Sequence, residues 1–222
     1  MPQSSIFNWR DGVGWLVLSG GGNFKDNETL DIDTAVLSRT VSHNPLAYIW
    51  AAGDVDTADL YLEYLDELGG RTGYLVDIAA ESDDSIYDQL KEAGIIVIGD
   101  GTNLQQLHNN LHGSVLQAIT EAYESGATIY GQGNGAAFLA SWMNLSGTGL
   151  QPGLGWLTNS IVVPYYTSER QPQVKAWLHD VLPTAYALGL GKSAALALGA
   201  DGQVEIWGSK DVTILLGQMP SE

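Results

Sequence analysis

The fold is decided by one stretch of the chain, Gly126-Ala127-Thr128-Ile129-Tyr130-Gly131-Gln132-Gly133-Asn134-Gly135-Ala136-Ala137. Its first half is apolar and contains β-branched and aromatic residues, which predicts a buried strand. A dense glycine cluster and a run of small residues follow, which predicts a tight turn into a helix. This is the layout of a nucleophile elbow, G-x-S-x-G, in which the nucleophile stands on a strained strand-to-helix turn. Gly131 and Gly135 match the outer glycines, but the central position is Gly133, which has no side chain that could attack a substrate.

The same stretch admits a second interpretation as a nucleotide-binding loop. Gly131, Gly133 and Ala136 fit the dinucleotide fingerprint G-x-G-x-x-G/A. That fingerprint also expects an acidic residue about twenty positions later, which would hold a ribose. Residues 151–160 contain no Asp or Glu, and the cluster lies past the middle of the chain. A nucleotide binder at Gly131 to Ala136 therefore stays an alternative that ranks below the elbow.

Outside this stretch, short apolar runs alternate with amphipathic segments. The apolar runs predict strands at residues 16–19, 47–51, 72–77, 95–98, 128–130 and 160–163. The amphipathic segments predict helices at residues 31–41, 56–68, 82–93, 103–125, 135–145 and 171–186. Several strands are apolar on both faces, as buried parallel strands are. The alternation predicts an α/β fold with a mostly parallel central sheet that helices cover on both faces.

The C-terminal part has a different pattern. Residues 195–198, 204–207 and 212–216 read as short strands joined by glycine-containing turns. We expect them to form an antiparallel β appendage at one edge of the sheet. Nothing marks a linker, so residues 1–222 are interpreted as a single domain.

Composition excludes several classes of function. Nine basic residues face 26 acidic ones, and a net charge of -17 repels both nucleic acid and anionic membranes. The absence of cysteine excludes disulfides, thiolate metal sites and cysteine nucleophiles. No apolar run is long enough to span a membrane and no signal peptide is visible, so we expect a cytoplasmic protein.

Two further motifs carry little weight. His108 and His112 have the helical spacing of a metal-binding pair, but the glutamate of HExxH is missing and a solvated helix face is the favoured interpretation. Gly191-Lys192-Ser193 resembles the end of a phosphate-binding loop, but Tyr186 stands where that loop needs a glycine. We therefore expect no metal and no cofactor.

Taken in order, the segments resemble the cyanophycinase and dipeptidase E (aspartyl dipeptidase) family of serine peptidases. The resemblance covers nearly the whole chain, and the stretches that carry it include Val17-Leu18-Ser19-Gly20-Gly21-Gly22, Ile95-Ile96-Val97-Ile98-Gly99-Asp100, Glu124-Ser125-Gly126-Ala127-Thr128-Ile129-Tyr130-Gly131 and Gly153-Leu154-Gly155-Trp156-Leu157. It implies a flavodoxin-like three-layer α/β/α sandwich of the class I glutamine amidotransferase-like type. Proteins of this fold often form dimers, so the resemblance leaves a homodimer open.

The differences from the family lie at the positions that hold its catalytic residues. Gly133 replaces the nucleophilic serine, and Tyr165 stands where the resemblance places the base histidine. Gly191 falls in the family's acidic segment, and Gly101 replaces the glutamine of Gly-Gly-Asp-Gln, while Asp100 is kept. A tyrosine with a pKa near 10 is a poor general base at neutral pH.

These departures lead to three hypotheses. The first is a non-catalytic homologue that retains a cleft for a small molecule or peptide, with candidate cleft residues Gly21, Gly22, Asp100, Gly101, Gly131, Gln132, Gly133, Asn134, Tyr165 and Tyr166. The second is a hydrolase of aspartyl peptides whose nucleophile has moved to another hydroxyl, with His179 or Glu169 as partner and Thr128, Ser141, Ser160 or Ser168 as nucleophile. The third is the nucleotide binder at the glycine cluster.

Overall fold

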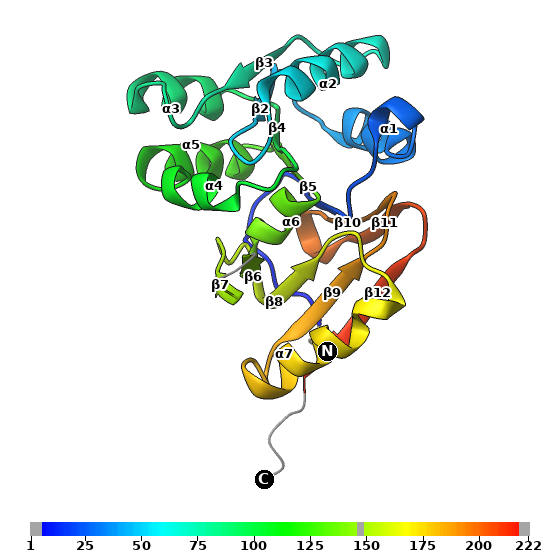
Figure 1. Cartoon of the computed structure of the whole chain (residues 1–222). Coiled ribbons are helices and arrows are strands. Elements are labelled where there is room, and N and C mark those ends of the chain that lie inside the picture. The colour runs from blue at the N-terminus through cyan, green and yellow to red at the C-terminus, as the bar shows by residue number, and fades with distance from the viewer. Residues whose placement is uncertain (1–5, 146–148, 218–222) are drawn as a thin grey trace.

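A seven-stranded, mostly parallel sheet lies at the centre of the computed structural model, which describes residues 6–145 and 149–217 (Figure 1). Its order is β11-β10-β1-β5-β4-β2-β3, and β1 runs parallel to β5 but antiparallel to β10. The strands are β1 (Leu16–Ser19), β2 (Leu46–Ile49), β3 (Gly73–Val76), β4 (Ile95–Ile98), β5 (Thr128–Gln132), β10 (Ala194–Leu198) and β11 (Val204–Gly208). The predicted α/β fold with a mostly parallel sheet is confirmed.

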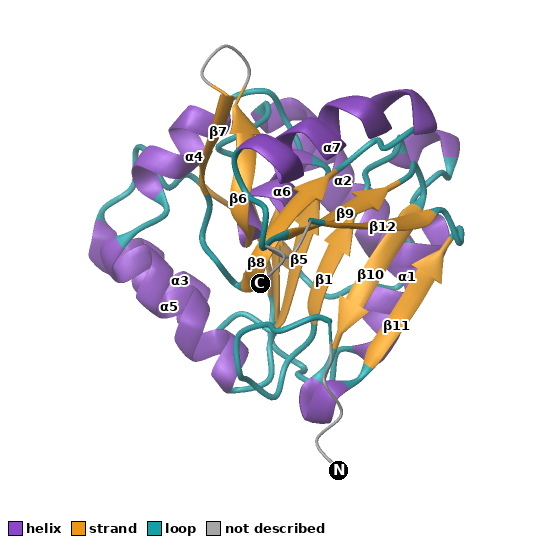
Figure 2. Cartoon of the chain, turned by 90° about the horizontal axis from the view of Figure 1, so that it is seen from below, coloured by secondary structure: helices purple, strands orange, loops and turns teal. Residues whose placement is uncertain are grey.

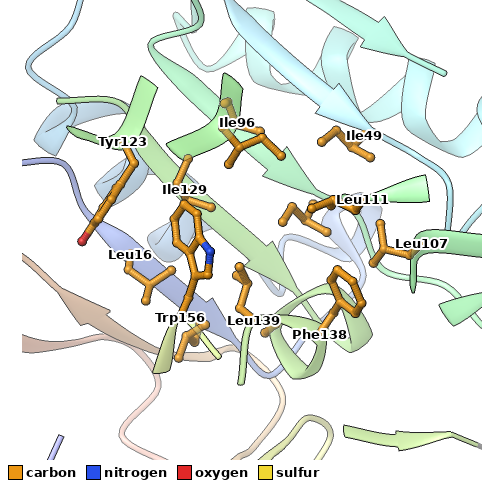
Figure 3. Packing of buried hydrophobic residues seen from close by; sticks show 14 of the residues in the cluster. Leu16, Ile49, Ile96, Leu107, Leu111, Tyr123, Ile129, Phe138, Leu139 and Trp156 are labelled. Carbon is orange, nitrogen blue, oxygen red and sulfur yellow. The ribbon is translucent and has the colours of Figure 1, made fainter. Parts of the chain in front are cut away.

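Helices cover both faces of this sheet because its strands bury alternate side chains on opposite sides. On one face, Val17 and Tyr130 pack with residues of α1 (Leu30–Arg39) and α2 (Val55–Glu67). On the other face, Leu16 and Ile129 belong to one buried hydrophobic cluster with Leu139 and Phe138, and Figure 3 shows these labelled residues. The helices on that second face are α3 (Asp83–Lys91), α4 (Leu104–Asn110), α5 (Gly113–Glu124) and α6 (Asn134–Leu139).

A second sheet of five strands, in the order β12-β9-β8-β6-β7, lies beside the first (Figure 2). Val174 and Leu178 of α7 (Gln171–Asp180) pack on it against Ile161 and Ala187. Its strands are β6 (Ala140–Leu145), β7 (Gly149–Pro152), β8 (Leu157–Val163), β9 (Tyr186–Leu190) and β12 (Val212–Leu216). Short 3-10 helices occupy Phe24–Asp26, Ser168–Arg170 and Ala200–Gly202.

Three predicted helices differ from the structure. The helix expected at 103–125 is two helices, α4 and α5, because the chain turns at Leu111 and His112 and Gly113 has a φ of +55°. The helix expected at 135–145 ends at Leu139, and residues 140–145 form strand β6 between β7 and β8. The helix expected at 171–186 ends at Asp180, shortly before Pro183, which cannot continue a helix.

The C-terminal strands divide between the two sheets. β10 and β11 form the expected antiparallel edge beside β1. β12 was expected to join them, but it pairs antiparallel with β9 in the second sheet. The turn at residues 209–211 therefore crosses from one sheet to the other and does not close a hairpin.

Candidate functional site

A sharp turn at Gly133 joins β5 to α6 at the carboxyl edge of the central sheet. Gly133 has φ +51° and ψ -118°, a conformation that residues with a Cβ atom rarely adopt. On either side of it the backbone passes close to other segments: a Cβ atom on Gly131 would lie 2.7 Å from Cα of Ala136, and one on Gly135 would overlap the carbonyl of Ile98. The small residues of the glycine cluster are thus required by close packing.

The carboxyl group of Asp100 fills the place that a side chain at position 133 would take. A Cβ atom built on Gly133 would overlap all three atoms of this group. Oδ1 of Asp100 accepts hydrogen bonds from the backbone N–H of Gly101 and of Asn134, each at 2.8 Å. The side-chain amide of Asn134 in turn donates to the carbonyl of Gly101 at 2.8 Å. The carboxylate is therefore held at the tip of the turn by donors from two different loops.

Tyr165 holds the other oxygen of this carboxylate. Its hydroxyl donates a short hydrogen bond to Oδ2 of Asp100. Its backbone has a φ of +49°, and its N–H donates to the carbonyl of Gly20 at 2.9 Å. The ring lies so close to Gly21, itself at φ +89°, that a Cβ atom there would overlap it. Burial raises the pKa of Tyr165, and the hydrogen bond to Asp100 raises it further, so the phenol is a neutral donor at neutral pH.

This arrangement lacks the parts that acyl transfer at an elbow needs. Position 133 offers no nucleophile. The backbone N–H after the nucleophile normally stabilises the oxyanion, and here that N–H, on Asn134, already binds a carboxylate. The Tyr165 hydroxyl donates its hydrogen bond to Asp100, and the raised pKa keeps it a neutral phenol, which is a poor general base. At this turn, position 133 has no side chain, and both the Asn134 N–H and the Tyr165 hydroxyl bind Asp100.

A cavity of about 410 Å³ opens beside the Asp100–Tyr165 pair. It lies at the carboxyl ends of the parallel strands, where open α/β sheets bind ligands. Six of the candidate cleft residues line it, namely Gly21, Gly22, Asp100, Gly101, Gln132 and Tyr165. The structure therefore brings these residues together around one space.

The remaining candidates lie elsewhere. Gly133 sits behind the Asp100 carboxylate, and Asn134 lines a smaller pocket of about 220 Å³ on the other side of Tyr165. Gly131 is buried inside β5. Tyr166 is buried in the core of the second sheet, where its ring packs on Gly189. Gly191 is also buried, and its amide donates to the carbonyl of Asp211.

The candidate cleft residues leave out ten residues that line the cavity, most of which follow β1 and β2. They are Ser19, Asn23, Phe24, Thr29, Tyr48, Gly53, Asp54, Thr57, Tyr61 and, from the loop before β10, Lys192; of these, Ser19, Tyr48 and Lys192 lie in stretches that the sequence analysis named for other reasons. The rule that ligands bind beyond the carboxyl ends of parallel strands points to the residues after β2. No pattern in the sequence points to Thr29 or Tyr61.

Three of the four hydroxyls proposed as relocated nucleophiles are engaged in structural contacts, and the fourth, on Ser168, is exposed. Those of Ser141 and Ser160 donate to the carbonyl of Leu157 at 3.1 and 2.7 Å. The Thr128 hydroxyl is buried against that of Thr40 at 2.7 Å, and His179 pairs with its exposed neighbour Asp180. In the described ranges, no serine or threonine hydroxyl hydrogen-bonds His179 or Glu169.

Residues 6–145 and 149–217 contain no group of three or more His, Cys, Asp or Glu that could hold a metal ion. Within the same ranges, every helix is too short or too polar to cross a bilayer.

Comparison with known proteins gives the chain a family. Its fold resembles the crystal structure of a peptidase from an acI-B1 Actinobacterium, with a TM-score of 0.74 and 18% identity over 95% of this chain and 93% of that one. It also resembles a candidate peptidase E protein from Listeria monocytogenes EGD-e, with a TM-score of 0.60 and 16% identity over 92% of this chain and 99% of that one. No curated protein matches. The model of peptidase family S51 matches residues 16–204, so this chain belongs to peptidase family S51.

Proposed function

We propose that this chain is a non-catalytic member of family S51 that retains its cleft as a binding site for a small molecule or peptide. One observation carries the proposal: the Asp100 carboxylate occupies both the space at Gly133 and the N–H of Asn134. In an active member, an attacking hydroxyl and a developing oxyanion would need those two positions.

An enzyme of this type that has lost its nucleophile keeps only the acceleration from binding and oxyanion donors, about 10³–10⁴ over water. Here the oxyanion donor on Asn134 is also engaged, so part of that residual acceleration is lost too. A carboxylate at this position also disfavours a second negative charge beside it. We therefore expect hydrolysis close to the uncatalysed rate.

The test is an assay of hydrolysis of β-aspartyl dipeptides, peptides with N-terminal aspartate, and cyanophycin. An active family S51 peptidase serves as positive control under the same conditions. We expect no turnover, and no labelling of any hydroxyl by a fluorophosphonate probe. Turnover at about 1 s⁻¹ or faster would overturn the proposal, and a labelled serine or threonine would support the relocated-nucleophile hydrolase in its place.

Restoring the family's residues gives a second test. In a Gly133→Ser, Tyr165→His variant, the new serine meets the Asp100 carboxylate, and the acidic segment at Gly191 is still altered. We expect this variant to stay inactive even where it folds. Measurable peptidase activity in the double variant would contradict the proposal.

The nucleotide-binding alternative gains no support from the turn. A phosphate would need the free N–H groups at the start of α6, and Asp100 already occupies that of Asn134 with a negative charge. Thermal-shift measurements with NAD, FAD and ATP test this alternative. A concentration-dependent rise in Tm with any of them would revive it.

A further inference from the structure

The cavity beside Asp100 has a wall of aromatic rings on the α1 and α2 side of the central sheet. Tyr61 is its centre, with ring centroids 5.2 Å from Phe24 and 5.5 Å from Tyr48. Tyr48 and Tyr61 are 6% and 2% exposed, so they form a fixed surface and not a mobile cover. The Tyr48 hydroxyl is oriented by a hydrogen bond to Oε1 of Gln132 at 3.3 Å, and Gln132 also lines the cavity.

The charged groups around this wall leave it negative. Asp54 and Asp100 line the cavity with carboxylates, and the lining cation Lys192 is paired with Glu28 at 2.6 Å. A further cation lies nearby: the ammonium group of Lys25 is placed over the ring of Phe24, 5.7 Å from its centroid. The Thr57 amide lowers the pKa of Asp54, which keeps that carboxylate charged. Burial raises the pKa of Tyr48, and nearby carboxylates raise it further, as a negative field does.

A buried hydroxyl at the cavity wall makes no hydrogen bond of ordinary geometry. Thr29 is 4% exposed and lines the cavity, and in the described ranges its Oγ1 lacks a well-aligned donor or acceptor, although it lies close enough to the Asp33 carboxyl group to lower the pKa of that group. It stands at the N-cap position of α1 but makes no capping bond. A buried polar atom left unpaired costs free energy, so this hydroxyl is a natural partner for a ligand.

We propose that this cavity binds an organic monocation, a primary ammonium or guanidinium group on a short aromatic or aliphatic body. The inference rests on the proposed function, because it assigns a ligand class to the retained cleft. The positive group is attracted by the carboxylates of Asp54 and Asp100 and donates to the Thr29 hydroxyl. The apolar body packs on Tyr48 and Tyr61, which line the cavity.

Isothermal titration calorimetry with phenethylammonium and butylguanidinium tests the ligand class. We expect saturable one-to-one binding with a Kd of about 0.1–1 mM, as small fragments in formed pockets give. The neutral 2-phenylethanol should bind about tenfold more weakly, and the anionic 3-phenylpropionate should not bind. Rising salt should weaken the binding of both cations.

Two variants, one of them with a matched control, test whether the ligand binds in this cavity. Asp54→Asn keeps a helix N-cap while removing one lining charge, and we expect the Kd to rise about threefold to fivefold. Asp56→Asn removes the same charge from the first turn of the same helix outside the cavity lining, and it should leave the Kd nearly unchanged. Thr29→Val removes the hydroxyl that would accept from the ligand and should raise the Kd about fivefold.

The outcomes separate this inference from the proposed function. No saturable binding of either cation at about 10 mM, or equal binding of 2-phenylethanol, would overturn the ligand class while leaving the proposed inactivity standing. If Asp54→Asn and Asp56→Asn changed the Kd equally, the cations would bind outside this cavity, and the assignment would be overturned. Turnover in the hydrolysis assay would overturn the proposed function, whatever the calorimetry gave.

Discussion

Replacing Gly133 with serine tests the central geometry of the site. The new Cβ atom would overlap the Asp100 carboxyl group, which must then leave its two N–H donors and the Tyr165 hydroxyl. Hydrogen bonds to a charged group contribute about 1.5–3 kcal/mol each, and hydration of the displaced carboxylate in the cavity recovers part of that. Backbone strain at φ +51° adds about 1–3 kcal/mol. We expect a loss of about 3 kcal/mol beyond the strain.

A matched control separates strain from overlap. Gly113 has a φ of +55°, and a Cβ atom there would meet nothing within 4 Å, so Gly113→Ser carries the strain alone. Chemical and thermal unfolding of both variants should differ by about 3 kcal/mol, or about 6–12 °C in Tm for a chain of this size. With Asp100→Ala in the background, the difference should fall below about 1 kcal/mol. Equal stability of the two serine variants in the native background would refute the reasoning.

Three further predictions follow from the same contacts. Tyr165→Phe leaves Oδ2 of Asp100 without its donor and should lower the free energy of unfolding by about 1–3 kcal/mol, measured by urea denaturation. Burial raises the pKa of the Asp33 carboxyl group, so the folded protein keeps this group protonated above the pKa of about 4 that it has in the unfolded chain. The free energy of unfolding should therefore fall as the pH rises above about 4, and Asp33→Asn should reduce this dependence on pH. Burial raises the pKa of Tyr61 and Tyr130 well above the usual value, so alkaline absorbance titration should show them ionising only when the protein unfolds.

Much of the fold could be predicted from local pattern. β1 and β4 begin and end where the sequence predicts, because both are apolar on both faces and are followed by glycine. β6 could not be found in the same way. Its residues follow directly on the small apolar residues of α6, and a short run of this kind fits a helix as well as a strand. Pairing with β7 and β8, which is a tertiary contact, decides the outcome.

Part of the site could likewise be predicted from the sequence, and part could not. The glycine motif predicts a turn without a nucleophile at Gly133, and the family resemblance places Tyr165 where the family has its histidine. It does not predict that Asp100 fills the turn, since nothing in its neighbourhood indicates the direction of its side chain. It also misses Thr29 and Tyr61, which come from helices and reach the cavity only through the packing of α1 and α2 on the sheet.

The departures at the site depend on one another physically. Asp100 can occupy the turn only because residue 133 has no side chain, and Tyr165 can donate to Asp100 only because the carboxylate is there. Gly21 must in turn lack a Cβ atom for the Tyr165 ring to fit. Returning a serine alone therefore meets an occupied position, and returning a histidine alone removes a donor from a carboxylate that stays in place. A serine at position 133 can therefore reach a substrate only if the Asp100 side chain first leaves this position. The comparison of Gly133→Ser in the native and Asp100→Ala backgrounds measures how strongly Asp100 opposes a side chain at the turn.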